Sequence, residues 1–363
     1  MRLMISGGGT GGHIYPALAL IERLKATGQL EAVLYVGTAK GLESRIVPKA
    51  GIPFETLELQ GFRRRLTLEN VQTVRLFLAS LKKAKQLLRA FKPDVVVGTG
   101  GYVSAGVLFA ATQLHIPTVI HEQNSVAGVT NKFLARFVTK IAITFPEVAA
   151  SFPAKKVVIT GNPRAQQVAG LKPNDRLADF GLDPKRRTLL IFGGSRGAPK
   201  INQAALAALD AFGKADFQTL FVTGSVHYER IKAQLPATLP ANVQVVPYVD
   251  DMPGILPDIS LVIGRSGATS LAELTALGLP SVLIPSPNVT HNHQFVNAHA
   301  LADQGAALVI TEPELDAQFA DTIIELMQDD PRLLQMAKAA KALGTPTAGD
   351  DLIAVLHQVI EKN

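Results

Sequence analysis

The chain is 363 residues long and contains no cysteine, which excludes disulfides, thiolate catalysis and cysteine-based metal sites. Hydrophobic residues make up 47% and charged residues 18%, so the composition is that of a folded protein, and the length suits two domains of about 150–200 residues. The net charge of +6 indicates an anionic partner, but 6% aromatic residues and no tryptophan disfavour nucleic acid.

The start of the chain reaches glycine too soon to supply the hydrophobic region of a signal peptide. No apolar run approaches the roughly 18–20 residues that cross a bilayer. We therefore expect a protein that is soluble or bound to a membrane surface.

Short apolar runs bounded by glycine recur along the chain, each followed by a helical pattern. Continuous apolar strands that alternate with helices indicate parallel sheets covered on both faces. The pattern predicts an α/β protein with two doubly wound domains. The predicted strands span residues 3–5, 33–36, 95–97, 118–120, 189–192, 220–223, 261–263 and 282–284.

The composition shifts between residues 160 and 187, where 161–164 and 171–175 have the character of a linker. We therefore expect one domain over residues 1–161 and a second over 162–363. The last predicted helix, 351–361, could pack back across the first domain. Two further helices are predicted just before it, over 316–328 and 331–343.

The first loop, residues 6–13, joins the first strand to a predicted helix over 14–25. Its glycines let the backbone approach a ligand, and the helix start directs N–H groups at anions. Three glycines have dinucleotide-binding spacing, but no acid follows strand 33–36 to hold a ribose, and no Lys-Ser/Thr pair completes a phosphate-binding NTPase loop. A tight turn without a ligand is the alternative. His13, at the mouth of the sheet, is expected to have a polar role.

The second loop, residues 193–198, repeats this strand–glycine–helix arrangement. In the third loop, residues 264–270, Ser270 and Glu273 have capping-box spacing. Glu273 could equally accept hydrogen bonds from ribose hydroxyls, and both interpretations stay open. Ligands of open parallel sheets bind at the carboxyl ends of strands, so these loops are candidate sites.

Two more segments, residues 98–102 and 121–124, also follow strands and are expected to form hydrogen bonds at the rim of the sheet. The later loop 285–294 contains His291 and His293, but no third metal ligand is near, so solvated or hydrogen-bonding histidines are the favoured interpretation.

The segment 63–92 contains nine Lys/Arg and a single acid, Glu69, and its leucines recur at helical spacing. A second basic and apolar segment follows at 132–140. Packing of the apolar stripe into the domain is one interpretation. Reversible docking of the first domain on an anionic lipid surface is the other, because each basic group near such a surface contributes about 1 kcal/mol.

Together the loops resemble the undecaprenyldiphospho-muramoylpentapeptide β-N-acetylglucosaminyltransferases, the peptidoglycan glycosyltransferases that form lipid II. The matching motifs occupy residues 8–13, 100–104, 121–124, 161–164, 193–198 and 265–268, with Gln294 and 297–298. The resemblance runs essentially end to end. It implies a GT-B fold with two Rossmann-like domains, an acceptor-binding first domain and a donor-binding second domain.

The resemblance also implies roles for individual residues. His13 is the candidate general base, with phosphate binding as the alternative, and the rim residues Gly100, Gly101, Tyr102 and His121 are expected to bind the acceptor. The residues expected to bind the donor are Thr10, Gly11, Gly12, Asn124, Arg164, Ser195, Val249, Ala268, Glu273 and Gln294. There is no Asp-x-Asp metal signature, so no metal and no cofactor are expected.

The implied reaction is an inverting transfer of N-acetylglucosamine from UDP-N-acetylglucosamine to the muramoyl 4-hydroxyl of lipid I. The implied location is peripheral, on the cytoplasmic face of the cell membrane, with wall-synthesis proteins as candidate partners. A UDP-N-acetylglucosamine 2-epimerase and a non-enzymatic membrane-recruitment subunit remain alternatives. The missing ribose-binding acid disfavours a nicotinamide-dependent oxidoreductase.

Overall fold

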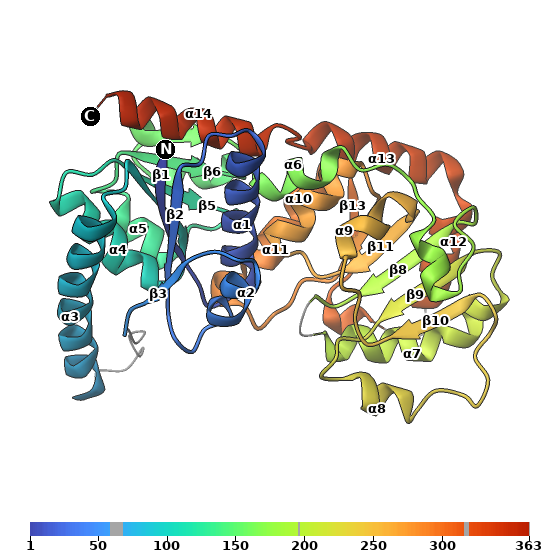
Figure 1. Cartoon of the computed structure of the whole chain (residues 1–363). Helices are drawn as coiled ribbons and strands as arrows, with labels where there is room; N and C mark the ends of the chain where they lie inside the picture. The colour runs from blue at the N-terminus through green and yellow to red at the C-terminus, as the bar shows by residue number, and fades with distance from the viewer. Residues whose placement is uncertain (59–67, 195–196, 316–318, 363) are drawn as a thin grey trace. The chain divides into compact units, whose positions relative to one another are not determined.

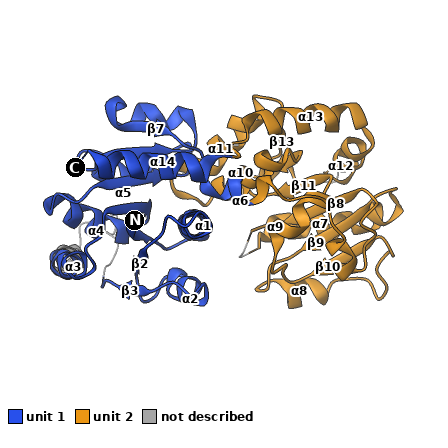
Figure 2. Ribbon diagram, turned by 45° about the horizontal axis from the view of Figure 1, so that its top comes forward, with its two compact units in different colours: residues 1–167, 347–363 blue, residues 168–346 orange. Residues whose placement is uncertain are grey.

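The structure is a computed structural model that describes residues 1–58, 68–194, 197–315 and 319–362, with side chains in the helix 68–91 described from residue 78. The chain divides into two compact units, coloured separately in Figure 2. Unit 1 comprises Met1–Gln167 and Thr347–Asn363, and unit 2 comprises Val168–Pro346. The sequence had suggested a division after residue 161.

Unit 1 is built on a parallel sheet of seven strands in the order β3-β2-β1-β4-β5-β6-β7 (Figure 1). Its central strands are almost wholly buried, as expected where helices cover both faces. The strands are β1 (Arg2–Gly7), β2 (Ala32–Gly37), β3 (Phe54–Thr56), β4 (Val95–Gly100), β5 (Thr118–Glu122), β6 (Lys140–Ile143) and β7 (Val157–Ile159).

The helices of unit 1 include one from the far end of the chain. The apolar face of α14 (Ala348–Glu361) joins the core beneath α1 (Gly11–Ala26), and Arg23 holds Asp350 through bonds of 2.6 and 2.8 Å. The predicted return of the last helix thus has a physical basis in this packing. The other helices are α2 (Glu43–Lys49), α3 (Leu68–Phe91), α4 (Tyr102–Gln113), α5 (Val129–Leu134) and α6 (Pro163–Ala169).

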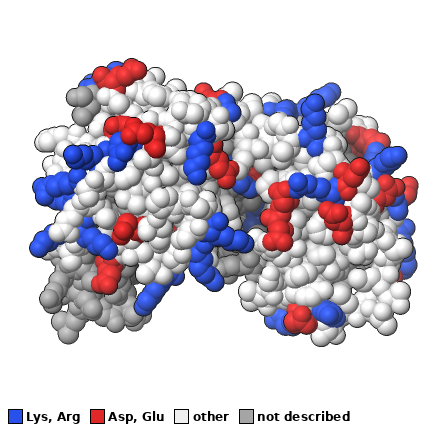
Figure 3. All heavy atoms as spheres, in the orientation of Figure 1, with Lys and Arg blue, Asp and Glu red and all other residues white. Residues whose placement is uncertain are grey.

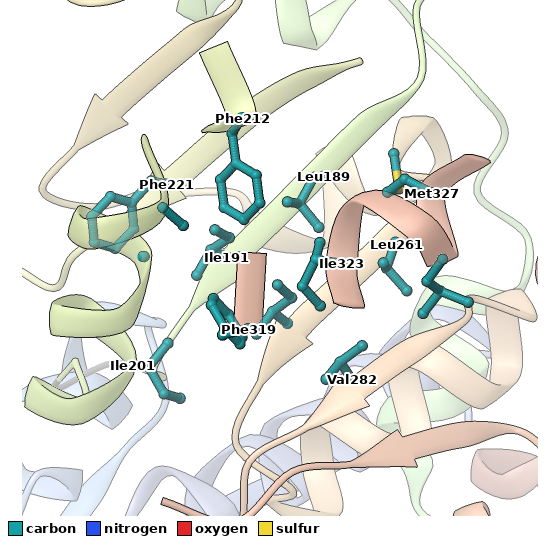
Figure 4. Close-up of a cluster of buried hydrophobic side chains, with 14 of the residues drawn as sticks. Leu189, Ile191, Ile201, Phe212, Phe221, Leu261, Val282, Phe319, Ile323 and Met327 are labelled. Carbon is teal, nitrogen blue, oxygen red and sulfur yellow. The ribbon is translucent and has the colours of Figure 1, made fainter. Parts of the chain in front are cut away.

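Unit 2 contains a parallel sheet of six strands in the order β10-β9-β8-β11-β12-β13. Figure 4 shows its core, where Leu189 and Ile191 of the sheet meet Phe212 and the helical residues Ile323 and Met327. The strands are β8 (Thr188–Phe192), β9 (Gln218–Val222), β10 (Val243–Val246), β11 (Leu261–Gly264), β12 (Ser281–Leu283) and β13 (Ala307–Val309). The helices are α7 (Pro199–Lys214), α8 (Tyr228–Lys232), α9 (Met252–Ile255), α10 (Ala268–Leu277), α11 (His293–Ala302), α12 (Phe319–Gln328) and α13 (Asp330–Leu343).

The eight predicted strands are all present, and the α/β prediction with two parallel sheets is confirmed. The linker interpretation of residues 161–164 is wrong. Gly161, Asn162 and Pro163 are buried, and α6 begins at Pro163. Asn162 also bonds Arg164 N through its Oδ1 atom at 3.1 Å, so this segment is a structured helix start rather than a free connection.

Candidate active site

The first loop leaves β1 and is held against the end of the neighbouring strand β4. Gly8 N donates to Gly100 O at 3.2 Å. A Cβ at Gly101 would lie 2.6 Å from Gly8 O, and φ of Gly101 is +83°, so both space and backbone conformation require glycine there. Thr10 and Gly12, at the start of α1, are exposed. The loop is therefore fixed on the side of β4, while the start of α1 is exposed.

His13 lies in the first turn of α1 and is half-buried. Its Nδ1 atom is 2.8 Å from Gly8 O and 3.5 Å from Thr10 Oγ1. A carbonyl oxygen only accepts, so the shorter contact requires the proton on Nδ1 and leaves the lone pair of the neutral ring on Nε2. This tautomer is the one that can accept a proton at Nε2.

The predicted acceptor residues of the β4–α4 turn lie beside this histidine. A Cβ at Gly100 would be 2.7 Å from His13 Cδ2, so the ring packs directly over the backbone of the turn. Tyr102 begins α4 with 46% of its surface exposed. The structure therefore brings His13, Gly100, Gly101 and Tyr102 together at the carboxyl ends of β1 and β4.

Glu43, the first residue of α2, is a site residue that the sequence analysis missed. Its side chain is fully buried, and its Oε2 accepts from Gly9 N of the first loop at 2.9 Å. Tyr35 also holds this loop, since its hydroxyl donates to Gly7 O at 2.9 Å. Burial, and then the nearby Glu43 carboxylate, raise the pKa of Tyr35, so this hydroxyl remains a donor.

His121, at the end of β5, is fully buried. Nε2 donates to Gly161 O at 2.9 Å, and Nδ1 accepts from Gln123 Nε2 at 3.0 Å. Burial lowers the pKa of His121 to about 4, with the Gly161 bond acting in the opposite direction. The ring is thus neutral at pH 7, and its position suits the support of the rim more than direct contact with a ligand.

Glu122 organises the loop that follows β5. Its carboxylate accepts from Asn124 N at 3.2 Å, Gly128 N at 2.9 Å and Asn131 Nδ2 at 2.8 Å. These bonds curl the loop so that Asn124, a predicted donor contact, is half-buried at the rim. The adjacent pair His121 and Glu122 is therefore structural, as expected of neighbours that point in opposite directions along a strand.

Arg164 is placed beside the helix that carries His13. Its guanidinium lies over the ring of Tyr15, 5.5 Å from the centroid, and donates to Gln167 Oε1 at 2.5 Å. A Cβ at Gly11 would be 3.0 Å from the same Tyr15 ring. Arg164 therefore belongs to the surroundings of the first loop in unit 1.

In unit 2 the second loop connects β8 to α7. Its glycines make close backbone approaches, because a Cβ at Gly193 would overlap Ala198 N and one at Gly197 would overlap Thr223 O. Ser195, a predicted donor contact, lies outside the described residues. The described part of the loop confirms the predicted strand–glycine–helix arrangement.

The third loop leads from β11 into α10, which begins at Ala268 after the N-cap Gly267. The capping-box interpretation of Ser270 and Glu273 is wrong, because both residues lie inside the helix. Glu273 is 7% exposed. Ala268, a predicted donor contact, is the first residue of the helix.

Gln294 ties the third loop to the loop after β12. Its Oε1 accepts from Ser286 N at 2.9 Å, and its backbone oxygen accepts from Ser266 Oγ at 2.7 Å. Asn297 Nδ2 donates to Ser266 O at 3.0 Å. Val249, which follows β10, is 5% exposed. The described positions of the third loop and of the loop after β12 therefore lie at neighbouring strand ends.

Among the described residues, no three His, Asp or Glu side chains are grouped to hold a metal ion. His293 Nδ1 donates locally to Thr290 O at 2.8 Å. No helix in the described part of the chain has the length and apolar character that spanning a membrane requires.

The sequence matches models of both halves of a known family. Residues 3–143 match the glycosyltransferase family 28 N-terminal domain, and residues 188–352 match the glycosyltransferase family 28 C-terminal domain. The two matches fall on the two sheets described above.

Individual relatives extend this similarity over the whole chain. The UDP-N-acetylglucosamine--N-acetylmuramyl-(pentapeptide) pyrophosphoryl-undecaprenol N-acetylglucosamine transferase of Lacticaseibacillus casei (strain BL23) is 69% identical over 362 residues, covering 100% of this chain and 99% of the relative. The crystal structure of Acinetobacter baumannii MurG is 30% identical, with a TM-score of 0.78 and coverage of 98% and 99%.

A solved UDP-N-acetylglucosamine 2-epimerase is 14% identical, with a TM-score of 0.68 and coverage of 100% and 98%, and shows only a shared fold. Sequence identity thus separates the transferases from the epimerase, since coverage is nearly complete for all of them. The chain has the GT-B fold and belongs to the family of UDP-N-acetylglucosamine--N-acetylmuramyl-(pentapeptide) pyrophosphoryl-undecaprenol N-acetylglucosamine transferases, within glycosyltransferase family 28.

Proposed function

We propose that this chain transfers N-acetylglucosamine from UDP-N-acetylglucosamine to the muramoyl 4-hydroxyl of lipid I, which gives lipid II. The observation that carries the proposal is the 69% identity over the full chain to a transferase of that name. An identity this high, without truncation of either sequence, supports a shared reaction rather than a shared fold alone.

In this proposal unit 1 binds the acceptor and unit 2 binds most of the donor. The helices α1, α7 and α10 carry no acidic residue in their first turns, which leaves their starts suited to a diphosphate. The donor residues proposed in unit 2 are Ser195, Val249, Ala268, Glu273 and Gln294. Those proposed in unit 1 are Thr10, Gly11, Gly12, Asn124 and Arg164.

His13 is the proposed general base. With the proton on Nδ1, its Nε2 takes the proton of the muramoyl hydroxyl as the oxygen attacks the anomeric carbon from the side opposite UDP. The glycosidic bond forms as the bond to the diphosphate breaks, and the configuration inverts. Backbone N–H groups at the helix starts stabilise the departing diphosphate without a metal.

The test is UDP release from UDP-N-acetylglucosamine with and without a short-chain lipid I analogue, in excess chelator. Release that depends on the acceptor, with a product heavier by one N-acetylhexosamine, is expected. Donor consumption without acceptor would favour the 2-epimerase alternative. No turnover despite tight membrane binding would favour a recruitment subunit.

We also propose that unit 1 docks reversibly on anionic lipid at the cytoplasmic face of the membrane. Phe109, Phe133 and Phe137 form a cluster with centroid separations of 5.1–5.8 Å, and the last two rings are 43% and 44% exposed. Exposed Lys132 and Arg136 flank them. An apolar patch edged by basic groups suits an anionic surface.

The helix α3 adds basic groups on the same side of the sheet, because α4 packs against both α3 and α5. On the face drawn in Figure 3, Lys and Arg side chains gather over the part of unit 1 where Figure 1 places α3. Arg63, Arg64 and Arg65 of the predicted basic run lie outside the described residues. Co-sedimentation with vesicles tests the docking, and equal binding to neutral and anionic vesicles would overturn it.

A further inference from the structure

The buried carboxylate of Glu43 lies in a cage of glycines. A Cβ at Gly8, Gly37 or Gly41 would run into the Glu43 side chain. Inside this cage Oε1 accepts from Thr38 N at 3.0 Å and from Thr38 Oγ1 at 2.6 Å, while Oε2 accepts from Gly9 N at 2.9 Å. Three donors therefore converge on one side chain that water does not reach.

These donors suit the carboxylate form of Glu43, which accepts through both oxygens. Backbone N–H groups can only donate, so both oxygens must act as acceptors. None of the ion pairs among the described residues involves Glu43. The negative charge of Glu43 is therefore stabilised by hydrogen bonds from Thr38 and from the first loop. The bond from the loop is donated by Gly9.

The bond to Gly9 connects Glu43 to His13 through a single peptide group. Gly9 N–H and Gly8 C=O belong to the same planar unit, and no peptide in the described structure is cis. In a trans peptide these two groups point in opposite directions. Glu43 thus binds one side, at 2.9 Å, and His13 Nδ1 binds the other, at 2.8 Å.

We propose that Glu43 is a positioning residue that orients and polarises His13 through the Gly8–Gly9 peptide. The proposal rests on the proposed role of His13 as general base. A carboxylate on the N–H side of a peptide makes the carbonyl oxygen a stronger acceptor, because hydrogen bonds in a chain polarise one another. The carbonyl then holds the proton on His13 Nδ1 and directs the Nε2 lone pair outward.

The same arrangement stabilises the positive ring that forms when His13 takes a proton, as a carboxylate bound directly to a catalytic histidine does. Here the Gly8–Gly9 peptide separates the carboxylate from the anionic donor. The carboxylate still polarises the ring through that peptide. Partners that act in the same indirect way on metal-bound histidines are typically worth about 10–100-fold in activity.

The first test measures which ring nitrogen of His13 carries the proton. In protein labelled with 15N-histidine, the ring nitrogens of His13, assigned with His13→Ala, report the tautomer. We expect a protonated Nδ1 and an unprotonated Nε2 in the unmodified chain at a pH where the ring is neutral. Glu43→Gln retains the shape but turns an amide NH2 toward one of the donors, so we expect a mixture of tautomers.

Two matched variants separate this effect from general loosening. Glu122→Gln changes an equally buried carboxylate of unit 1 that has no bond to the first loop, and Thr38→Val removes one bond to Oε1 while sparing the Gly9 bond. Both should leave the His13 tautomer unchanged. A His13 spectrum that is the same in Glu43→Gln as in the unmodified chain would overturn the proposal, whatever the activity.

The second test is a double-mutant cycle on kcat, with acceptor and donor saturating. Glu43→Gln should lower kcat by about 10–100-fold with a smaller change in the donor KM. On the His13→Ala background it should lower kcat no further, because its effect passes through the ring. Equal losses on both backgrounds would mean that Glu43 only supports the fold, and would overturn the proposal.

If Glu43→Gln fails to fold, Gly41→Ala reaches the same carboxylate, because the added Cβ would overlap Glu43 Oε2. It should reproduce the tautomer mixture and the loss of kcat, and normal values of both would contradict the proposal. A small effect of His13→Ala on turnover would instead refute the base assignment of the proposed function. The spectrum would still decide whether Glu43 controls the ring.

Discussion

The first loop of unit 1 and the second loop of unit 2 share one local design but are held in place differently. In unit 1 side chains add to the backbone bond from Gly8 N to Gly100 O, with Glu43 on Gly9 and Tyr35 on Gly7. In unit 2 the described part of the loop is packed through its backbone, since Gly197 approaches Thr223 O too closely for any side chain.

This difference fits a division of labour. Side-chain anchors can orient a titrating ring, and unit 1 places His13 directly on its anchored peptide. Close backbone approaches instead leave room for a ligand against N–H groups, which suits the binding of a diphosphate. Similar glycine patterns can thus serve proton transfer in one unit and anion binding in the other.

The largest effect is expected from replacing His13, and its absence would contradict the role assigned to the first loop. His13→Ala should lower kcat by about 100-fold or more, because a positioned base contributes about 10²–10⁴-fold. The dissociation constant of UDP-N-acetylglucosamine, measured by calorimetry, should change little. His357→Ala, an exposed histidine of the same unit, is the control. A loss of kcat below about tenfold would assign the proton to another group.

As the pH falls, unit 1 should lose folding stability at a higher pH than unit 2. His121 is buried with its pKa lowered to about 4, whereas all histidines of unit 2 are at least partly exposed. The unfolded chain takes up this proton near pH 6.5 and the folded chain only near pH 4, so stability falls as the pH drops through that window. The loss approaches about 3 kcal/mol, at 1.36 kcal/mol per pKa unit.

Thermal unfolding followed from pH 7.5 to 4.5 checks this. His121→Gln keeps a donor for Gly161 O but does not titrate, so its stability should decline less across the window. Parallel pH dependence of the two proteins would show that His121 does not contribute to the acid sensitivity of unit 1.

Gly197→Ala tests the role assigned to the second loop, in unit 2. Alanine at φ +72°, against Thr223 O, imposes strain of about 1–3 kcal/mol. We expect the donor dissociation constant to rise by about tenfold, at 1.4 kcal/mol per factor of ten, with kcat nearly retained at saturating donor. Gly170→Ala, where nothing lies within 4 Å of the added Cβ, is the matched control. A loss of kcat with unchanged donor affinity would reverse the assigned roles of the two loops.

The smallest effect concerns the membrane. Lys132→Gln should weaken binding to anionic vesicles about fivefold, since one basic group near such a surface contributes about 1 kcal/mol. Lys338→Gln, an exposed position in unit 2, should leave binding unchanged. Co-sedimentation at low salt measures both, and equal losses would indicate attraction to the whole protein instead of a face of unit 1.

The central strands could be predicted because each is a continuous apolar run. The strands that escaped prediction are short and lie toward the sheet edges, such as β3 and β13, each with three residues. Three residues are too few to establish a period. The segment 161–164 was misjudged because its glycine and proline resemble a linker, whereas its burial depends on contacts with distant residues such as His121.

Site residues could be predicted only where they are adjacent in the sequence to a recognisable motif. His13 directly follows the glycines of the first loop, so sequence pattern and position coincide. Glu43 has no such signal, because it is 34 positions from Gly9 along the chain and meets it only in the fold in which β2 pairs with β1. The alternative for Glu273 depended on where α10 begins, and helix boundaries are poorly defined by sequence.

The packing of α14 on α1 has a consequence for the synthesis of the protein. Asp350 meets Arg23 across 327 positions, so the core of unit 1 stays incomplete until nearly the whole chain has left the ribosome. Unit 2 is contiguous and can close earlier, although it is made later. During elongation the nascent N-terminal region therefore exposes the apolar surface that α14 will cover, and a fragment ending at residue 167 would retain that surface as a route to aggregation.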